Sequence, residues 1–167
     1  MKTYSSPREV VAEIKQLIET DKPSPRPPSA LVRILKALCE SRHYQRAGVF
    51  LAVNGREVPR AFGGAQAPSA TMPELVVPIK IASRALGSLR VQLAPGHTFS
   101  PEERVLLHEV ADLLALYLTS KGKYLVRKTR EALRESASGG ETRGYQPSAD
   151  KTAVESLRAA AGQKSRP

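Results

Sequence analysis

The sequence has few of the residues on which metal, redox and membrane functions depend. Its 167 residues include one cysteine, no tryptophan and 5% aromatic residues, so its core must be largely aliphatic. The single thiol, Cys39, excludes an internal disulfide, a zinc site built from several cysteines and a two-thiol redox cycle. No run approaches the roughly 20 apolar residues of a membrane span, and the first residues contain no apolar signal segment. These absences predict a reduced, cytoplasmic, soluble protein without a metal or a cofactor.

Positive charge is the strongest bias in the composition. Lys and Arg number 26 against 16 Asp and Glu, which gives a net charge of +10. Residues 121–167 carry 11 basic and five acidic side chains, whereas residues 46–120 carry seven and six. The excess therefore lies at the C-terminal end, beside a nearly neutral centre. A solvated extension is the favoured explanation, and contact with nucleic acid or anionic lipid is the alternative.

The first 28 residues predict an amphipathic helix and a proline-rich linker. Ser6, Pro7 and Glu9 supply a capping serine, a proline at the first helical position and the acid of a capping box. Four prolines between residues 23 and 28 then exclude a helix and favour an extended chain. The apolar side chains that recur at helical spacing are Val10, Ile14, Leu17 and Ile18.

Residues 29–93 predict one helix followed by two hairpins. Ser29 begins a helix whose apolar residues recur at helical spacing, and Asn54-Gly55 is the strongest two-residue hairpin turn in the chain. Runs rich in branched residues lie on both sides of that turn and again on both sides of Ser83-Arg84. The expected strands are residues 47–53, 56–62, 75–81 and 85–93.

The helix from residue 100 to 120 has the clearest start in the sequence. Ser100, Pro101 and Glu103 combine a cap, a first-position proline and a capping-box acid. Its apolar residues cover more than one face, which predicts burial both on the sheet and against a second surface. Gly122 interrupts the helix, and helix is expected to resume over 121–135 before a disordered basic tail.

Three stretches of this order resemble the GAF domain family. Residues 46–53 look like the first core strand of that family. Residues 74–81 (ELVVPIKI), followed by 86–91, look like its paired strands, and residues 99–118 look like its closing helix. The resemblance covers roughly residues 29–120. It implies an α+β fold of the profilin/PAS-like kind, with a central antiparallel sheet and helices packed on one face.

The chain departs from the GAF pattern in the interval from Gly63 to Glu74. GAF domains usually hold helices and a further strand there, and these form a wall of the ligand pocket. A dozen residues rich in Gly, Ala, Pro and Ser cannot enclose a large ligand, so a reduced pocket is expected. The residues expected to face that pocket are Phe50, Phe62, Met72, Val77 and Ile79.

The enzymatic GAF branch that the chain most resembles is the free methionine-(R)-sulfoxide reductase. That resemblance implies a nucleophilic and a resolving thiol on the interval that is short here. Cys39 instead follows Leu35 and Leu38 at helical spacing, where a buried structural role is expected. The three histidines lack the spacing of a metal site. We therefore expect no catalytic residue and no metal ligand.

Both amphipathic helices have more apolar width than one monomer needs. Pairing them with their copies about a two-fold axis would bury that surface, and the linker would allow the first helix to leave its own domain. A homodimer is therefore expected, as is common among GAF proteins. The expected interface residues are Val10, Ile14, Leu17, Leu113 and Tyr117.

The sequence thus predicts a non-enzymatic, GAF-like regulatory or signalling module of a bacterial type. It would act through dimerisation and through binding of a protein or a small ligand. One alternative is a nucleic-acid-associated regulator that uses the basic tail, and another is a degenerate methionine-(R)-sulfoxide reductase. The expected segments are 1–28 (helix and linker), 29–120 (GAF-like domain), 121–135 (basic helical extension) and 136–167 (disordered basic tail).

Overall fold

The computed structural model describes residues 4–22, 29–64 and 70–138, and its described part up to Glu135 forms one compact unit. The expected tail therefore lies almost entirely outside the described residues. Within the described ranges, no helix is long and apolar enough to cross a membrane. The elements are α1 (Pro7–Thr20), α2 (Ala30–Arg42), β1 (Arg46–Val53), β2 (Arg56–Gly64), β3 (Glu74–Ile81), β4 (Arg84–Gln92), α3 (Pro101–Thr119) and α4 (Lys123–Ser138).

The four strands form one antiparallel sheet in the order β2-β1-β4-β3. Two hairpins, β1–β2 and β3–β4, meet along β1 and β4, where Phe50 lies opposite Ser88. Asn54 and Gly55 take positive φ angles of 52° and 74°, as the tight turn of the first hairpin requires. The register shifts between Val49 and Phe50, so β2 carries a bulge at this point. The expected pair of hairpins is confirmed.

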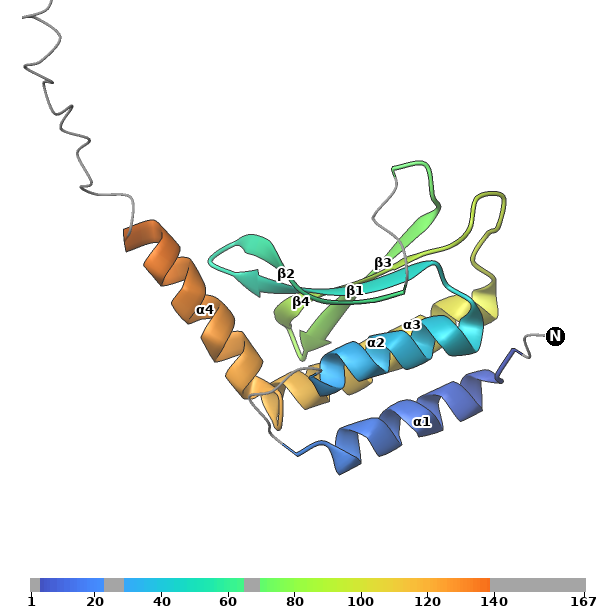
Figure 1. The fold of residues 1–167 in the computed structure, drawn as a ribbon, viewed down its shortest axis with the longest axis horizontal. Helices are drawn as coiled ribbons and strands as arrows, with labels where there is room; N and C mark the ends of the chain where they lie inside the picture. The colour runs from blue at the N-terminus through green and yellow to red at the C-terminus, as the bar shows by residue number, and fades with distance from the viewer. Residues whose placement is uncertain (1–3, 23–28, 65–69, 139–167) are drawn as a thin grey trace, which may run out of the picture. The chain divides into compact units, whose positions relative to one another are not determined.

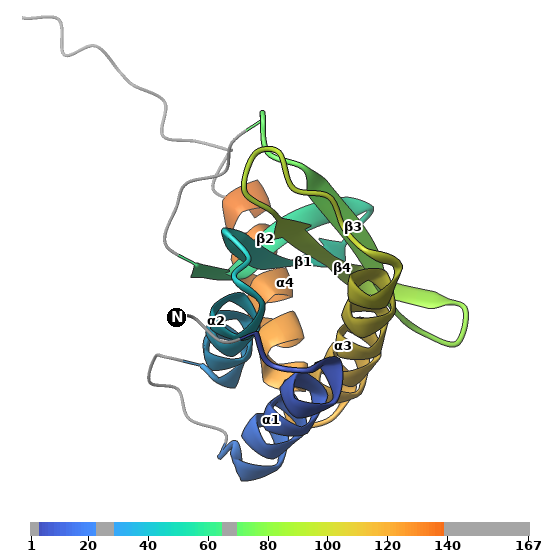
Figure 2. The same cartoon turned by 90° about the vertical axis from the view of Figure 1, so that its right-hand side faces the viewer.

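Helices α2 and α3 cover one face of the sheet, and α1 lies on α2 and α3 (Figures 1 and 2). Alternate strand residues such as Val49, Leu89 and Ile79 point towards these helices and are fully buried. The approach of β2 to α2 is close, because a Cβ atom at Gly63 would lie 2.4 Å from the carbonyl carbon of Leu35. The expected α+β architecture, with helices on one side of an antiparallel sheet, is confirmed.

Capping boxes begin both α1 and α3, as the sequence predicts. At α3, Ser100 Oγ accepts from the Glu103 N–H at 3.1 Å, and Glu103 Oε2 accepts from the Ser100 N–H at 2.9 Å. Ser6 and Glu9 form the same reciprocal pair at α1. Both boxes satisfy backbone donors that have no partner within the helix and fix the residue at which each helix starts.

Helix α1 packs on its own chain, which corrects the expectation that it leaves its domain. Val10 and Ile14 are buried in the same core as the sheet, so they do not lie at an interface with a copy. The end of α1 is fastened as well. The Tyr117 hydroxyl donates to Asp21 Oδ2 at 3.1 Å, and Lys121 Nζ donates to the Ile18 and Glu19 carbonyls at 3.0 and 2.7 Å. The amphipathic helix expected within residues 1–28 is therefore present, and it packs on the core of the same chain.

Helix α4 follows α3 after a short break at Gly122. The Gly122 N–H donates to the Tyr117 carbonyl at 2.7 Å and closes the end of α3. Leu125 is buried with the core, whereas charged residues occupy most of the remaining surface of α4. The expected resumption of helix over 121–135 is confirmed, with α4 continuing to Ser138.

Candidate functional site

The face of the sheet opposite to α2 and α3, here called the open face, carries a row of aromatic and cationic side chains. Phe50 on β1 and Phe62 on β2 meet edge to face, with ring centroids 5.7 Å apart. The Arg46 guanidinium lies 4.1 Å from the Phe62 ring centroid, and the Arg90 guanidinium lies 4.4 Å from that of Phe50. These four residues form an Arg–Phe–Phe–Arg row across three strands.

A carboxylate holds the Arg90 end of this row in place. Glu57 on β2 pairs with Arg90 and accepts a hydrogen bond from the Ser88 hydroxyl at 2.6 Å. The Ser88 hydrogen bond, together with Arg90, lowers the pKa of Glu57, so this carboxylate stays ionised at neutral pH. Gln92 Nε2 donates to Glu74 Oε1 at 3.3 Å further along β4. The open face is thus a preorganised polar and aromatic surface.

The described residues leave much of this face accessible to solvent. Phe62 is 39% exposed and Val76 is 49% exposed. Phe62 on β2 and Val76 on β3 lie on the two edge strands of this sheet face, and each retains apolar area that a partner could cover. The open face is therefore the first candidate binding surface.

The structure divides the residues expected to face a ligand pocket. Phe50 and Phe62 lie on the open face, and Met72 is half-buried in the segment before β3. Val77 and Ile79 are instead fully buried on the helix side, which corrects their assignment. Successive strand residues point to opposite faces, so Val76 and Pro78 share the open face with their partners Arg90 and Ser88. The sequence of β3 contains the signal for this orientation, because the charged residues Glu74 and Lys80 lie on the same face as Val76 and Pro78, whereas every residue of the other face is apolar.

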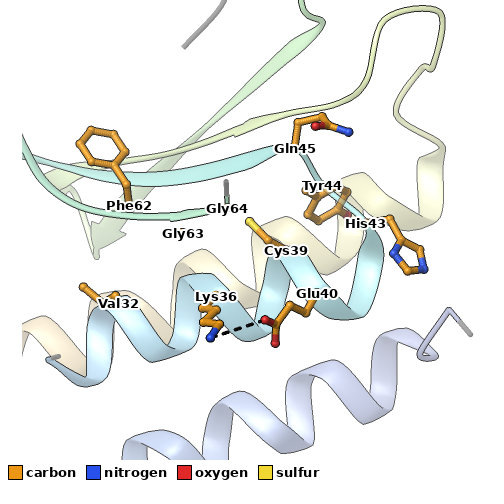
Figure 3. A pocket seen from close by; sticks show the side chains of 10 residues that line it. All are labelled: Val32, Lys36, Cys39, Glu40, His43, Tyr44, Gln45, Phe62, Gly63 and Gly64. Atoms are coloured by element: carbon orange, nitrogen blue, oxygen red, sulfur yellow. Dashed lines mark ion pairs between the residues drawn. The ribbon is translucent and has the colours of Figure 1, made fainter. Parts of the chain in front are cut away.

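The second candidate site is a hollow of about 880 Å3 that lies between α2 and β2 and contains the only thiol of the chain (Figure 3). Cys39 points from α2 towards β2, whereas Phe62 points away from the helix, on the other side of its strand. The thiol is 5% exposed, and burial raises its pKa to about 12. The expected burial of Cys39 is confirmed. At neutral pH the sulfur is therefore protonated, a form that is a poor nucleophile.

A third surface is a groove of about 480 Å3 between α1 and α3, here called the α1–α3 groove. Its floor includes Val11, Leu113 and Leu116, and Leu116 is 62% exposed. The α1 wall carries two cations and the α3 wall carries two carboxylates. The charged residues of the two walls are Arg8, Lys15, Glu109 and Asp112.

The groove contains only part of the expected dimer interface. Leu113 lines it, but Val10, Ile14 and Tyr117 are buried inside the protomer, and Leu17 packs half-buried against the core. The Tyr117 assignment fails because its hydroxyl reaches inward to Asp21. Leu116 was missed as an interface residue. Its position three residues after Leu113, one turn along the same helix, was the sequence signal that could have identified it.

No protein-family model matches the sequence, and no curated protein matches it either. Solved structures do match. The free methionine-R-sulfoxide reductase from Neisseria meningitidis, in complex with its substrate, has a TM-score of 0.59 at 17% identity, covering 74% of this chain and 99% of that one.

Two signalling-type domains match equally well. The GAF domain from an Acinetobacter phosphoenolpyruvate-protein phosphotransferase has a TM-score of 0.58 at 13% identity and covers 73% of this chain and 98% of that one. The GAF domain of a putative sensor histidine kinase from Pseudomonas syringae pv. tomato has a TM-score of 0.56 at 14% identity, with 74% and 92% covered. At these identities the likeness concerns the fold. The described chain has the fold of GAF domains.

Proposed function

We propose that the chain is a non-enzymatic regulatory module of GAF fold that works as a homodimer. The structural neighbours include GAF domains of a phosphotransferase and of a sensor histidine kinase, which supports a regulatory role. They also include free methionine-R-sulfoxide reductases, so the fold alone does not separate the two classes. The chemistry of this chain's own residues must decide between them.

The state of Cys39 supports the non-enzymatic alternative. Thiol-based reduction of a sulfoxide needs a thiolate that attacks sulfur and a second thiol that resolves the product. The chain has one cysteine, and burial holds that cysteine in its protonated form. A degenerate reductase remains the rival hypothesis, and it requires Cys39 to react.

One observation carries the proposed dimer, namely the opposite charges on the two walls of the α1–α3 groove. A two-fold axis places α1 of one protomer against α3 of its copy. Arg8 and Lys15 would then face Glu109 and Asp112 of the partner copy. The same contact covers Leu116 in both protomers and removes its apolar surface from water. The groove is therefore self-complementary in both charge and hydrophobicity.

Leu116 allows the expected effect to be estimated. Fully burying a leucine side chain contributes about 1.5–3 kcal/mol, so covering its exposed 62% contributes about 1–2 kcal/mol per protomer. A two-fold symmetric dimer covers Leu116 in both protomers, so the contribution doubles to about 2–4 kcal/mol. This free energy corresponds to a roughly 30- to 700-fold change in dimer affinity. Replacing Leu116 by Glu also adds a negative charge near Glu109 and Asp112.

The experiment is sedimentation velocity across a micromolar concentration series. Wild-type protein is expected to be a dimer, and Leu116→Glu is expected to be a monomer with an unchanged melting temperature. Val76→Glu is the matched control, because it places the same charge at an exposed apolar site on the opposite side of the sheet. A wild-type monomer at tens of micromolar, or a Leu116→Glu variant as dimeric as Val76→Glu, contradicts the proposal.

A further inference from the structure

We propose, beyond the regulatory role above, that the open face binds single-stranded RNA through the Arg46–Phe62–Phe50–Arg90 row. A four-stranded antiparallel sheet with helices on one side and aromatic residues on the other can stack two or three unpaired bases. The chain supplies that geometry in β2-β1-β4-β3, with both phenylalanines on neighbouring strands.

Stacking is the first component of the proposed binding. Phe62 is 39% exposed, and its ring meets Phe50 edge to face, so the two rings offer differently oriented surfaces. Bases stack on phenylalanine rings and equally on arginine guanidinium planes. Arg46 and Arg90 already lie over these rings. An incoming base can therefore extend the existing stack, or replace a guanidinium that then pairs with a phosphate.

Hydrogen-bonding atoms without a partner are the second, independent observation. Gln92 is 7% exposed, and its Oε1 atom is buried with no hydrogen-bond partner among the described residues. The Nε atoms of Arg60 and Arg90 are likewise buried without a hydrogen-bond partner among the described residues. Leaving buried polar atoms unpaired is costly, and a ligand that donates to the glutamine oxygen would remove part of that cost.

Charge and the nature of the glutamine acceptor select the ligand. Arg46, Arg60 and Arg90 are contributed by β1, β2 and β4, and this cluster of cations, of which Arg90 is paired with Glu57, favours an anionic ligand. An acidic protein would match the charge but would not use the flat faces of the aromatic row. Arg46 lies directly opposite Gln92, so a base that displaces the Arg46 guanidinium would bring a ribose 2′-hydroxyl within reach of the buried, unpaired Gln92 oxygen, and deoxyribose has no such donor. The proposal therefore specifies RNA over DNA.

The test is fluorescence anisotropy of the full chain with a labelled ten-nucleotide oligouridylate. Phe62→Leu keeps an apolar side chain but removes the ring, and it is expected to weaken binding about 5- to 100-fold. Phe62→Tyr is expected to bind like wild type. Arg46→Gln is expected to lower the dependence of log affinity on log salt by about one unit. Arg104→Gln, an exposed cation on α3, is the matched control and should change affinity less than two-fold.

Each outcome decides the proposal. If Phe62→Leu binds as well as wild type, the open face is not the site, and any affinity comes from basic residues elsewhere. Equal affinity for oligouridylate and for oligodeoxyuridylate, which differs only by the 2′-hydroxyl, contradicts the choice of RNA, and no binding at 100 μM contradicts the whole proposal. If Phe62→Leu fails to fold by circular dichroism, Val76→Glu provides the second variant, because it adds a negative charge at an exposed position of the same face and should abolish binding.

Discussion

The reactivity of Cys39 follows directly from its place between α2 and β2. Burial raises the pKa of this thiol from the ordinary value of 9.0 to about 12. At pH 8 the thiolate fraction falls accordingly, from about a tenth to about one ten-thousandth. Only the thiolate attacks the disulfide bond of a reagent such as 5,5′-dithiobis(2-nitrobenzoate), which releases a thionitrobenzoate ion. The native protein should therefore react at least ~1000-fold more slowly than the same chain unfolded in urea.

The measurement compares the pseudo-first-order rates of the native and the unfolded chain, with glutathione in the same urea concentrations as the control. The 5% exposure of Cys39 restricts access of the reagent and acts in the same direction as the pKa. A native rate within about tenfold of the unfolded rate would show an accessible or activated thiol. That result would refute the reasoning from burial and revive the reductase hypothesis.

Three further predictions concern stability. Tyr117→Phe removes the hydrogen bond that the hydroxyl donates to Asp21, so thermal unfolding should show a loss of about 1.5–3 kcal/mol. Ser100→Ala removes the cap of α3 and should cost about 1 kcal/mol in urea denaturation, whereas Ser83→Ala in an exposed turn should cost little. Raised pKa values of Cys39 and Tyr44 mean that the unfolded chain releases these protons at lower pH. The contribution of these two groups to the free energy of unfolding should therefore be fully present below about pH 9 and should be lost as the pH rises towards 12. The loss should be smaller in Cys39→Ala.

Local signals in the sequence were sufficient for most of the fold. The capping boxes at Ser6 and Ser100, and the turn at Asn54-Gly55, depend only on residues within four positions of each other. The same is true of the burial of Cys39, which the neighbouring leucines of α2 already indicate. Each of these features is local, and each is present in the structure.

Features that depend on distant contacts were predicted less well. The misassignment of Val77 and Ile79 is an exception, because Glu74 and Lys80 mark the opposite face of β3 and provided a local signal for the inward orientation of these two residues. The docking of α1 depends on Tyr117 and Lys121, about a hundred residues further along the chain, and neither contact has a local signal. The Arg–Phe–Phe–Arg row combines three strands, so it too appears only in the folded sheet.

The proposal of a GAF fold without thiol catalysis is tested most directly by turnover of free L-methionine-(R)-sulfoxide. The full chain is incubated with the substrate and dithiothreitol, and methionine is quantified by chromatography beside a Cys39→Ser variant. Wild type and variant are both expected to produce methionine only at the rate of the protein-free control, because the single thiol is buried and protonated. Turnover by the wild type that Cys39→Ser abolishes would contradict the proposal.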